Sequence, residues 1–351
     1  MVRFAAATAV ADEGVTIVVS DLHLGAAGTT DGAFVSFLEW VGARARSDER
    51  SWRIVVLGDF LDLLHAPGAT PTEAVEAALR DRPTLRALAG AAASGISVAV
   101  VPGNHDSELL DPVVQARLRD LAAEAGGPRA ASIRRYLTFH PWFLLIPGVL
   151  YAEHGSQYHA LNAVRDPLSP AGRWSGQIPL GAVLDLHRSE PRQALLRLVR
   201  RRRSAPARTR MLEQAHASGL RPETLDALAE LGLASPLDLA RRVLAGARGA
   251  RRPVEAEQRA AAAAVHRLLR REGKAVPIYV FGHTHRAASA DVEAGDTRLR
   301  WFNSGSWTDE LSFVEIDASA RPVAARLRRW NGPQVPTAMS IASGRAYEAA
   351  R

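Results

Sequence analysis

The stretch RIVVLGDFLD, residues 53–62, joins an apolar run directly to two carboxylates. Residues 53–57 form a short run rich in β-branched side chains, which is typical of a strand buried on both faces. Asp59 and Asp62 follow at once. Because ligands bind at the carboxyl ends of the strands in open α/β sheets, this stretch predicts a buried strand that ends in a functional site.

Four more polar clusters follow apolar runs elsewhere in the chain. Three of the runs, Thr16–Ser20, Ser97–Val101 and Pro277–Phe281, have the same β-branched character as residues 53–57. The fourth run, Val149–Glu153, reads as the second strand of a hairpin that begins in Tyr136–Ile146. The clusters after these four runs are Asp21-Leu22-His23, Gly103-Asn104-His105-Asp106, Gly282-His283-Thr284-His285 and His154-Gly155. We therefore expect the clusters to converge at one edge of the fold.

Helical patterns alternate with the first strands and predict a layered α/β core. These patterns cover Gly32–Arg46, Thr72–Ala93 and Asp111–Gly126. Further strands are expected near the end of the chain, and we assign them to a second sheet. They cover Arg298–Phe302, Leu311–Ile316 and Pro322–Trp330.

A long Arg-rich segment with helical patterns separates the fourth cluster, His154-Gly155, from the fifth, Gly282-His283-Thr284-His285. It includes the patterns Gln193–Arg203, Pro222–Gly232, Ser235–Ala247 and Val254–Arg271. We interpret residues 166–273 as a helical insertion or cap on a catalytic core formed by residues 12–165 and 274–330, followed by a tail, residues 331–351. Residues 224–243 superficially suggest a helix-hairpin-helix, but an ordinary pair of helices explains so short a match better.

Composition sets limits on chemistry and location. With 351 residues and 47% hydrophobic content the chain can bury a large core, and the absence of cysteine means that any metal is held by oxygen and imidazole ligands. The net charge of +7 favours anionic partners, although Arg is common throughout the chain. Residues 1–11 are a poor match to a signal peptide, so we expect a cytoplasmic protein. Peripheral membrane contact through the Arg-rich insertion is an alternative location.

The five clusters together supply ligands for two metal ions that share one carboxylate. Asp21 and His23 are two residues apart, so in an extended strand they point to the same face. Asp59 has two carboxylate oxygens and could bridge two cations about 3.5–4 Å apart, as in two-metal hydrolases. Each cluster alone is more often structural, whereas the ordered set indicates attack on a phosphate ester by a hydroxide that bridges two metals.

The set resembles the calcineurin-like metallophosphoesterase superfamily, whose pattern DxH, GDxxD, GNH(D/E), H and GHxH is complete between Asp21 and His285. The resemblance implies an α/β fold, a layered αββα sandwich of two mainly mixed β-sheets flanked by helices. It also implies two divalent metal ions bridged by Asp59. The ligands of one ion would be Asp21, His23, Asp59 and His285, and those of the other Asp59, Asn104, His154 and His283. Manganese is the expected metal, and iron, zinc, cobalt and nickel also suit these ligands.

The resemblance further assigns catalysis to His105, which would protonate the leaving group or stabilise charge on the phosphoryl oxygens. It assigns Asp62 to orient His105. Asp106 is a competing partner for the same imidazole. Arg165 and Arg286 are candidates for contacts with substrate phosphate, although solvated surface positions explain each of them better in a chain this rich in Arg.

The motif set indicates the bond that is cleaved but leaves the substrate open. The first hypothesis is hydrolysis of a phosphate mono- or diester in an anionic substrate. An alternative is a phosphatase or pyrophosphatase of a nucleotide-sugar or lipid-linked substrate at the membrane surface. The related enzymes that cleave a UDP-linked acylated sugar usually carry Arg where this chain has His105, so we place that substrate lower. A nuclease or nucleic-acid-binding module is the third and least favoured hypothesis, and the oligomeric state is open.

Overall fold

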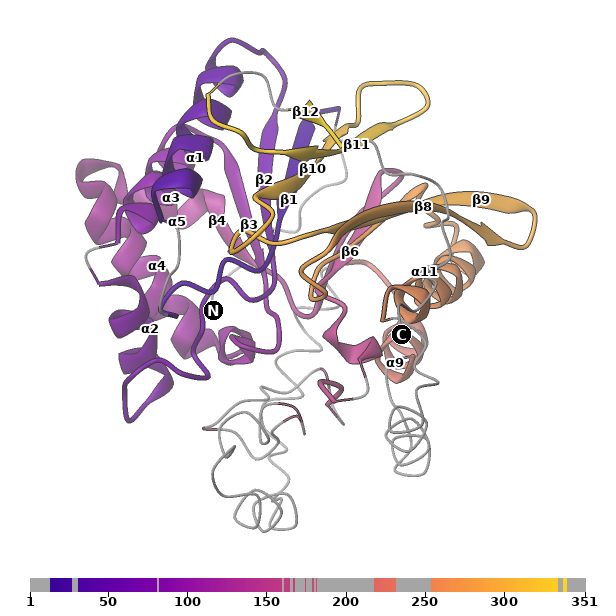
Figure 1. The fold of residues 1–351 in the computed structure, drawn as a ribbon, viewed down its shortest axis with the longest axis horizontal. Helices are drawn as coiled ribbons and strands as arrows, with labels where there is room; N and C mark the ends of the chain where they lie inside the picture. The colour runs from indigo at the N-terminus through magenta and orange to yellow at the C-terminus, as the bar shows by residue number, and fades with distance from the viewer. Residues whose placement is uncertain are drawn as a thin grey trace, which may run out of the picture.

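Two β-sheets pack face to face, with helices on both outer faces, in the computed structural model of the chain (Figure 1). The structure describes residues 13–26, 31–80, 82–159, 161–164, 218–231, 254–333 and 337–339, together with residues 167, 174, 179 and 181. The expected fold class, an αββα sandwich of two mixed sheets, is confirmed in this part of the chain.

The first sheet has seven strands in the order β12-β11-β10-β1-β2-β3-β4. Their bounds are β1 Val15–Val19, β2 Trp52–Leu57, β3 Ser97–Val101, β4 Leu137–Phe139, β10 Ser312–Asp317, β11 Ala324–Arg329 and β12 Thr337–Ala338. Strands β1 to β4 run parallel to one another, and β10 to β12 are antiparallel. The parallel half therefore places three predicted motifs at one edge, after β1, β2 and β3.

The second sheet has five strands in the order β5-β6-β7-β9-β8. Their bounds are β5 Phe143–Ile146, β6 Leu150–Glu153, β7 Ile278–Phe281, β8 Ala287–Ala294 and β9 Thr297–Ser304. Strand β6 is parallel to β7 and β7 to β9, whereas the hairpins β5–β6 and β8–β9 are antiparallel. The remaining two motifs follow the neighbouring strands β6 and β7.

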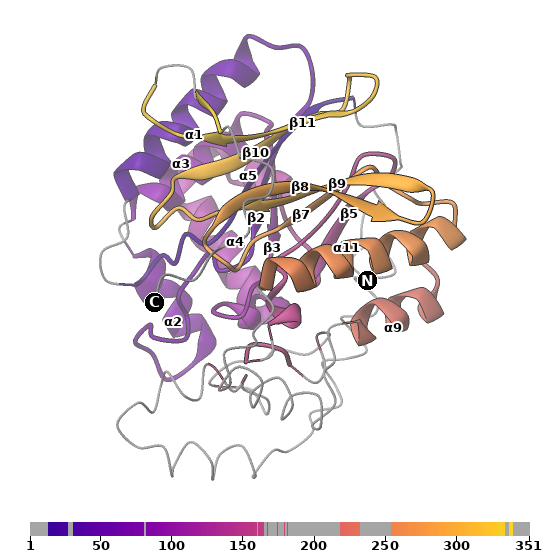
Figure 2. The same cartoon turned by 45° about the vertical axis from the view of Figure 1, so that its right-hand side comes forward.

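Helices form the two outer layers (Figure 2). On the first sheet lie α1 Asp31–Arg46, α2 Pro71–Leu79, α3 Pro83–Ala93, α4 Pro112–Gly126 and α5 Ala130–Tyr136, and on the second lie α9 Pro222–Glu230 and α11 Val254–Arg271. Short 3-10 turns cover η1 Ser107–Leu110, η2 Gly127–Arg129 and η3 Ser156–Tyr158. None of the helices in the described ranges is long and apolar enough to span a membrane.

Strict alternation along the central strands explains the four layers. In β2, Ile54 and Val56 pack against the helices of the first layer, whereas Val55 and Leu57 pack between the sheets. In β7, Tyr279 packs under α11 while Val280 lies between the sheets. Because both faces of each strand are buried, each strand is a continuous run of apolar residues in the sequence. Each such side chain contributes about 1.5–3 kcal/mol by leaving water.

Two predicted assignments are wrong. The pattern over Thr72–Ala93 forms two helices, because Pro83 cannot donate the backbone hydrogen bond of a helix interior and instead begins α3. Strands β10 and β11 join the first sheet, not the second, since β10 pairs antiparallel with β1. Strand β8 has no counterpart in the sequence prediction. The tail predicted to begin at residue 331 contributes β12, which pairs with β11.

The described helices between residues 166 and 273 belong to the sandwich. Apolar residues of α11, among them Val265 and Leu269, pack with Tyr279 and Trp301 of the second sheet, and α9 packs in the same cluster. The other helical patterns predicted in this interval lie outside the described residues. The division of the chain at residues 166 and 273 stays a prediction.

Candidate metal centre

The five predicted motifs come together because both sheets end at the same side of the sandwich. Asp21 and His23 follow β1, Asp59 follows β2, and Asn104 follows β3. His154 follows β6, and His283 and His285 follow β7. Parallel neighbouring strands place their carboxyl ends side by side, so each sheet contributes one wall of a common site.

Five of the seven candidate ligands have a left-handed backbone. The φ angles are 56° at Asp21, 49° at His23, 48° at Asp59, 74° at His283 and 57° at His285. Non-glycine residues rarely adopt this region, and such conformations cluster at functional sites. An extended strand, which the sequence suggested, is therefore not the reason why the side chains of Asp21 and His23 point to the same site. Their side chains converge because each loop turns sharply after its strand.

Backbone hydrogen bonds hold these turns in place. The amide of Asp21 donates to the carbonyl of Gly58 at 3.1 Å, and the amide of His23 donates to the carbonyl of Asp59 at 2.9 Å. The amide of Gly58 in turn donates to the carbonyl of Val101 at 2.7 Å. The loops after β1, β2 and β3 are thus tied into one unit, which limits how far any ligand can move.

The first ligand group consists of Asp21, His23, Asp59 and His285. Nε2 of His23 lies 3.2 Å from Nε2 of His285 and 3.8 Å from Oδ2 of Asp59. Nε2 of His285 lies 3.2 Å from Oδ1 of Asp21. Asp21, His23 and His285 thus form one compact group of potential metal ligands, and His23 links it to Asp59, with which it forms a second group that also includes His105.

The second ligand group consists of Asp59, Asn104, His154 and His283. Nε2 of His154 lies 3.2 Å from Oδ2 of Asp59 and 3.1 Å from Oδ1 of Asn104. His283 approaches the same carboxylate within a compact group of potential metal ligands. Asp59 is the one residue that takes part in both groups.

The orientation of the His154 ring is fixed by a hydrogen bond at its Nδ1, on the side away from Asp59 and Asn104. Its Nδ1 lies 3.1 Å from the carbonyl of Leu57, which can only accept, so Nδ1 carries the proton. This leaves Nε2 directed at Asp59 and Asn104. A Cβ on Gly58, whose φ is 80°, would lie only 2.2 Å from Nδ1 of His154. Glycine is therefore required for the imidazole to pack this closely against the β2 turn.

The arrangement fits divalent cations better than it fits a hydrogen-bonded network. Ligand atoms about 2.0–2.2 Å from a shared ion lie about 3.0–3.5 Å from each other, which matches the 3.1–3.2 Å separations found here. Oδ1 of Asp21 is buried without a well-aligned hydrogen bond among the described residues, although His285 is near. The two imidazole nitrogens of His23 and His285, 3.2 Å apart, face each other with either a shared proton or a cation between them.

The electrostatics of the group are dominated by carboxylates and imidazoles that share a buried space. Burial alone would raise the pKa of Asp59, but His154 and His105 outweigh it and hold the pKa well below its usual value. Burial alone would lower the pKa of His154, but Asp59 and Asp21 raise it to about 10. Because imidazole binds a metal in its neutral form, a cation has to displace that proton.

Asp62, and not Asp106, contacts the imidazole of His105. Oδ1 of Asp62 lies 3.0 Å from Nδ1 of His105. The carboxylate of Asp106 instead accepts backbone N–H bonds from Phe60 at 2.7 Å and Gly103 at 2.6 Å. Asp106 therefore joins the loops after β2 and β3. Of the two carboxylates considered as partners of the His105 imidazole, the geometry favours Asp62.

Three further polar side chains contact the centre and were not among the ligands or catalytic residues predicted from the sequence. Nδ1 of His65 lies 2.9 Å from Oδ2 of Asp62. Nδ1 of His159 and Nδ2 of Asn162 lie 3.0 Å and 3.1 Å from Nε2 of His283. The sequence placed His159 and Asn162 either at the substrate entrance or at an ordinary helix start, and it favoured a structural or solvent-exposed role for His65.

The two arginines considered as phosphate contacts gain no support from the described structure. The side chain of Arg286 is exposed, and its backbone amide donates to the hydroxyl of Thr284. Arg165 lies outside the described residues.

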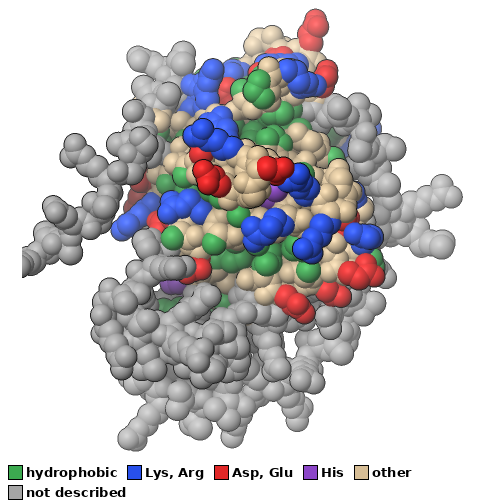
Figure 3. Space-filling model, turned by 90° about the vertical axis from the view of Figure 1, so that its right-hand side faces the viewer, with side chains coloured by type: hydrophobic (Ala, Val, Ile, Leu, Met, Phe, Trp, Pro, Cys, Tyr) green, Lys and Arg blue, Asp and Glu red, His purple; other side chains and the backbone are tan. Residues whose placement is uncertain are grey.

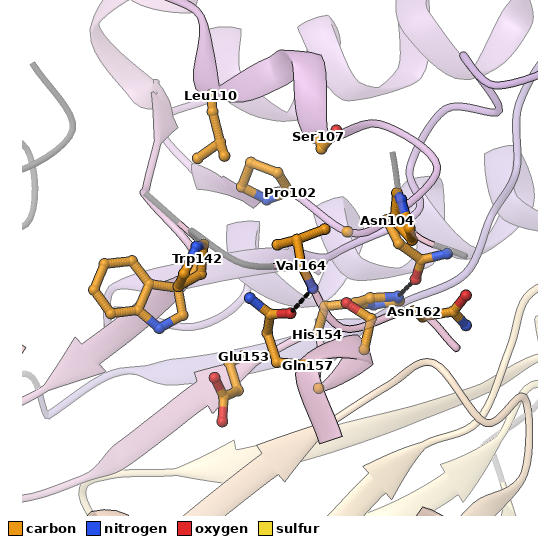
Figure 4. Close-up of a pocket in the computed structure, with 15 residues that line it drawn as sticks. Pro102, Asn104, Ser107, Leu110, Trp142, Glu153, His154, Gln157, Asn162 and Val164 are labelled. Atoms are coloured by element: carbon orange, nitrogen blue, oxygen red, sulfur yellow. Dashed lines mark hydrogen bonds between the residues drawn. The ribbon is translucent and has the colours of Figure 1, made fainter. Parts of the chain in front are cut away.

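A pocket of about 50 Å³ opens beside Asn104 and His154 (Figure 4). Its polar lining includes Ser107, Glu153, Gln157 and Asn162. Its apolar lining is formed by Pro102, Leu110, Trp142, Val164, Pro167 and Pro179. The pocket thus places a largely apolar surface next to the second ligand group.

Helix α11 is connected directly to the loop that carries His283. Gln258 is fully buried, and its Nε2 donates to the carbonyl of Gly282 at 3.1 Å. Its Oε1 accepts from Nδ2 of Asn303 at 3.1 Å, and Asn303 donates to the same Gly282 carbonyl at 2.7 Å. The asparagine in the small-residue turn after β9 therefore supports the metal loop together with α11.

Comparison with known proteins identifies the family of the chain. A family model described as calcineurin-like phosphoesterase matches residues 15–287, a range that contains every candidate ligand. Among solved structures, the chain is similar to phosphopantetheinyl hydrolase from Mycobacterium tuberculosis, with 15% sequence identity and a TM-score of 0.31, over 85% of this chain and 91% of that chain. No curated protein matches the sequence.

Proposed function

This chain belongs to the calcineurin-like phosphoesterase family and is a hydrolase of phosphoric esters; from that premise we propose that it hydrolyses a phosphate mono- or diester with two divalent cations. The observation that carries the proposal is the convergence of ligand atoms from both sheets at separations of 3.1–3.2 Å. Manganese is the proposed metal, because the nitrogen and oxygen ligands suit it.

Asp21, His23, Asp59 and His285 would hold one cation, and Asp59, Asn104, His154 and His283 the other. When bound, the cations supply positive charge to the phosphate oxygens and lower the pKa of water. The residues themselves fix the positions of the ions. The Leu57 carbonyl orients His154, and the backbone hydrogen bonds between the loops after β1, β2 and β3 orient Asp21 and His23. Substrate phosphate would thus be held in one place relative to the attacking oxygen.

His105 is the proposed general acid for the leaving group. Its imidazole packs edge-on against His23 with ring centroids 4.7 Å apart, so it borders the first ligand group. Its backbone amide donates to Oδ1 of Asp59 at 2.8 Å, which links the imidazole's position to the bridging carboxylate. Nδ1 donates to Asp62, and this leaves Nε2 to pass a proton to the oxygen of the departing alcohol.

The apolar pocket beside Asn104 would receive the organic part of the ester. Trp142 and Leu110 provide an apolar wall there, and Gln157 and Asn162 provide hydrogen-bonding groups. This supports an ester whose organic group has an apolar part near the phosphate.

Location at a membrane surface, or a nucleic-acid partner, has less support. On the face that carries α11 and the β8–β9 hairpin, basic and acidic side chains are mixed (Figure 3). Arg298 there pairs with Asp291, and Arg270 with Asp296. The Arg-rich stretch Gln193–Arg203 lies outside the described residues, so peripheral membrane contact and cytoplasmic location stay predictions.

The proposal is tested by hydrolysis with reconstituted metal. Protein loaded with Mn²⁺ should cleave a 4-nitrophenyl phosphate monoester or diester, and Asp59→Asn should abolish turnover and reduce the bound metal. Asp120→Asn is the matched control, because Asp120 lies on α4 with its side chain about half-exposed and paired with Arg134. His105→Ala should keep both metals and lose rate by a factor of about 10²–10⁴ on an ester with a poor leaving group.

Two results would contradict the proposal. The first is no turnover of either ester with any of manganese, iron, zinc, cobalt or nickel. The second is binding of the metals with unchanged affinity by Asp59→Asn. Loss of metal from His105→Ala would contradict only the role given to His105.

A further inference from the structure

The carboxylate of Asp62 contacts two imidazoles and not one. Its Oδ1 lies 3.0 Å from Nδ1 of His105, and Nδ1 of His65 lies 3.0 Å from the same Oδ1 and 2.9 Å from Oδ2. The Asp62 side chain is only 7% exposed, whereas those of His105 and His65 are 24% and 42% exposed. A buried carboxylate is thus placed between the proposed general acid and a second histidine nearer to solvent.

The chemistry of these contacts fixes the donors. An ionised carboxylate can only accept hydrogen bonds, so each imidazole donates through Nδ1. The ring of His105 therefore directs Nε2 away from Asp62, as its proposed role requires. His65 supplies a second donor to the same carboxylate.

The backbone holds His65 in this position. The turn after Asp62 is closed by the amide of Ala66, which donates to the carbonyl of Asp62 at 3.0 Å. The amide of Leu63 donates to the carbonyl of His105 at 3.1 Å, so the two histidine-bearing loops are joined directly. His65 thus meets Asp62 as part of one hydrogen-bonded unit that includes His105.

We infer that His65 is a positioning residue that acts through Asp62 on His105, an inference that rests on the proposed role of His105 as general acid. The terminal torsion of an aspartate is broad, so one hydrogen bond to His105 leaves the plane of the carboxylate free to rotate. The second donor from His65 fixes that plane. A fixed carboxylate holds the His105 imidazole in one orientation, and proton transfer depends on that orientation.

Asp106 cannot take over this support. Its carboxylate is fully buried and already accepts from the backbone amides of Phe60, Leu61 and Gly103. Removal of the His65 imidazole is therefore expected to weaken the hold on Asp62 without a substitute from this neighbour.

The test compares two leaving groups. A general acid matters for an ester that releases a poor leaving group, such as phenol or an alkyl alcohol, and matters little for 4-nitrophenol, which departs without a proton. With Mn²⁺-loaded enzyme, His65→Ala should lower kcat for a phenyl or alkyl phosphate about 10- to 100-fold and for the 4-nitrophenyl ester less than about 3-fold. KM and bound manganese should be unchanged.

Two further variants separate positioning from a general loss of structure. His65→Asn keeps an N–H close to the place of Nδ1 and should restore most of the lost rate. In an Asp62→Asn background, His65→Ala should cause no further loss of kcat, because its effect passes through Asp62.

Other outcomes would overturn the inference. Equal loss of rate on both leaving groups, or no rescue by His65→Asn, would mean that His65 serves only local structure. Asp62, His65 and His105 also form a group that could hold a cation. Three bound metals per chain that fall to two in His65→Ala would assign a third metal site instead. If wild-type enzyme hydrolyses none of the esters, the proposed function itself fails.

Discussion

Gln258 provides a quantitative test of how α11 supports the metal loop. Its amide makes two buried hydrogen bonds, to the carbonyl of Gly282 and from Nδ2 of Asn303, each at 3.1 Å. In Gln258→Leu both bonds are lost while the side-chain volume is nearly kept. Asn303 and Gly282 still bond each other at 2.7 Å, so neither is left without a partner.

The expected cost follows from that bookkeeping. Two neutral hydrogen bonds at about 1 kcal/mol each predict a loss of about 2 kcal/mol in the free energy of unfolding. This is a factor of about 30 in the folding equilibrium. Because Gly282 precedes His283, the freed loop should also weaken metal binding about 10- to 100-fold, as is typical when a partner behind a metal ligand is removed.

Urea unfolding followed by tryptophan fluorescence measures the first quantity, and titration with Mn²⁺ measures the second. Both should be made on the full chain. A change in unfolding free energy below about 0.5 kcal/mol with unchanged Mn²⁺ affinity would refute the reasoning, because it would mean that the loop is held without α11. A stability loss without a change in metal affinity would refute the link between Gln258 and His283.

Three further predictions follow from single contacts. Gly103→Ala should lose metal and activity while circular dichroism stays native, because its Cβ would lie 2.2 Å from Oδ1 of Asp59; Gly90→Ala, on an open face of α3, is the control and should be neutral or stabilising. Tyr158→Phe should lower the free energy of unfolding by about 1–3 kcal/mol in urea, because its hydroxyl donates at 2.6 Å to the buried Glu153, and a loss below 0.5 kcal/mol would disprove this. Burial, with Arg53 nearby, lowers the pKa of His140 to about 4 in the folded protein. In the unfolded chain its pKa is about 6.5, so the unfolded chain binds a proton first as the pH falls. Stability is therefore lost as the pH falls from about 6.5 to about 4. His140→Gln should remove up to about 3 kcal/mol of that pH dependence, and identical unfolding profiles for both proteins from pH 7 to 4 would contradict it.

The local amino-acid sequence was sufficient to locate the central strands and the candidate ligands. Thr16–Ser20, Ser97–Val101 and Pro277–Phe281 are continuous apolar runs because each strand is buried on both faces, so the signal does not depend on neighbours. The polar clusters are equally local, since each follows its strand within a few residues. Their order along the chain was enough to predict a dinuclear site in the family to which the chain belongs.

The assignment of strands to sheets could not be made in the same way. An apolar run reports that a strand is buried and does not report which strand lies beside it. Strands β10 and β11 were therefore placed in the wrong sheet, and β8, whose residues are mostly half-buried, gave too weak a pattern to be noticed. Strand pairing is a contact between distant segments, and only the packed structure determines it.

The same distinction holds within the metal centre. The sequence by itself determined which residue types are available and, through their position after buried strands, that they meet at one edge. Only the tertiary structure decided that Asp62 contacts His105 while Asp106 binds backbone amides, and that His65 contacts both oxygens of Asp62. It also decided that Asp21 and His23 converge through left-handed turns. Side-chain partners depend on the direction in which each loop turns, and that direction is set by hydrogen bonds between loops far apart in the chain.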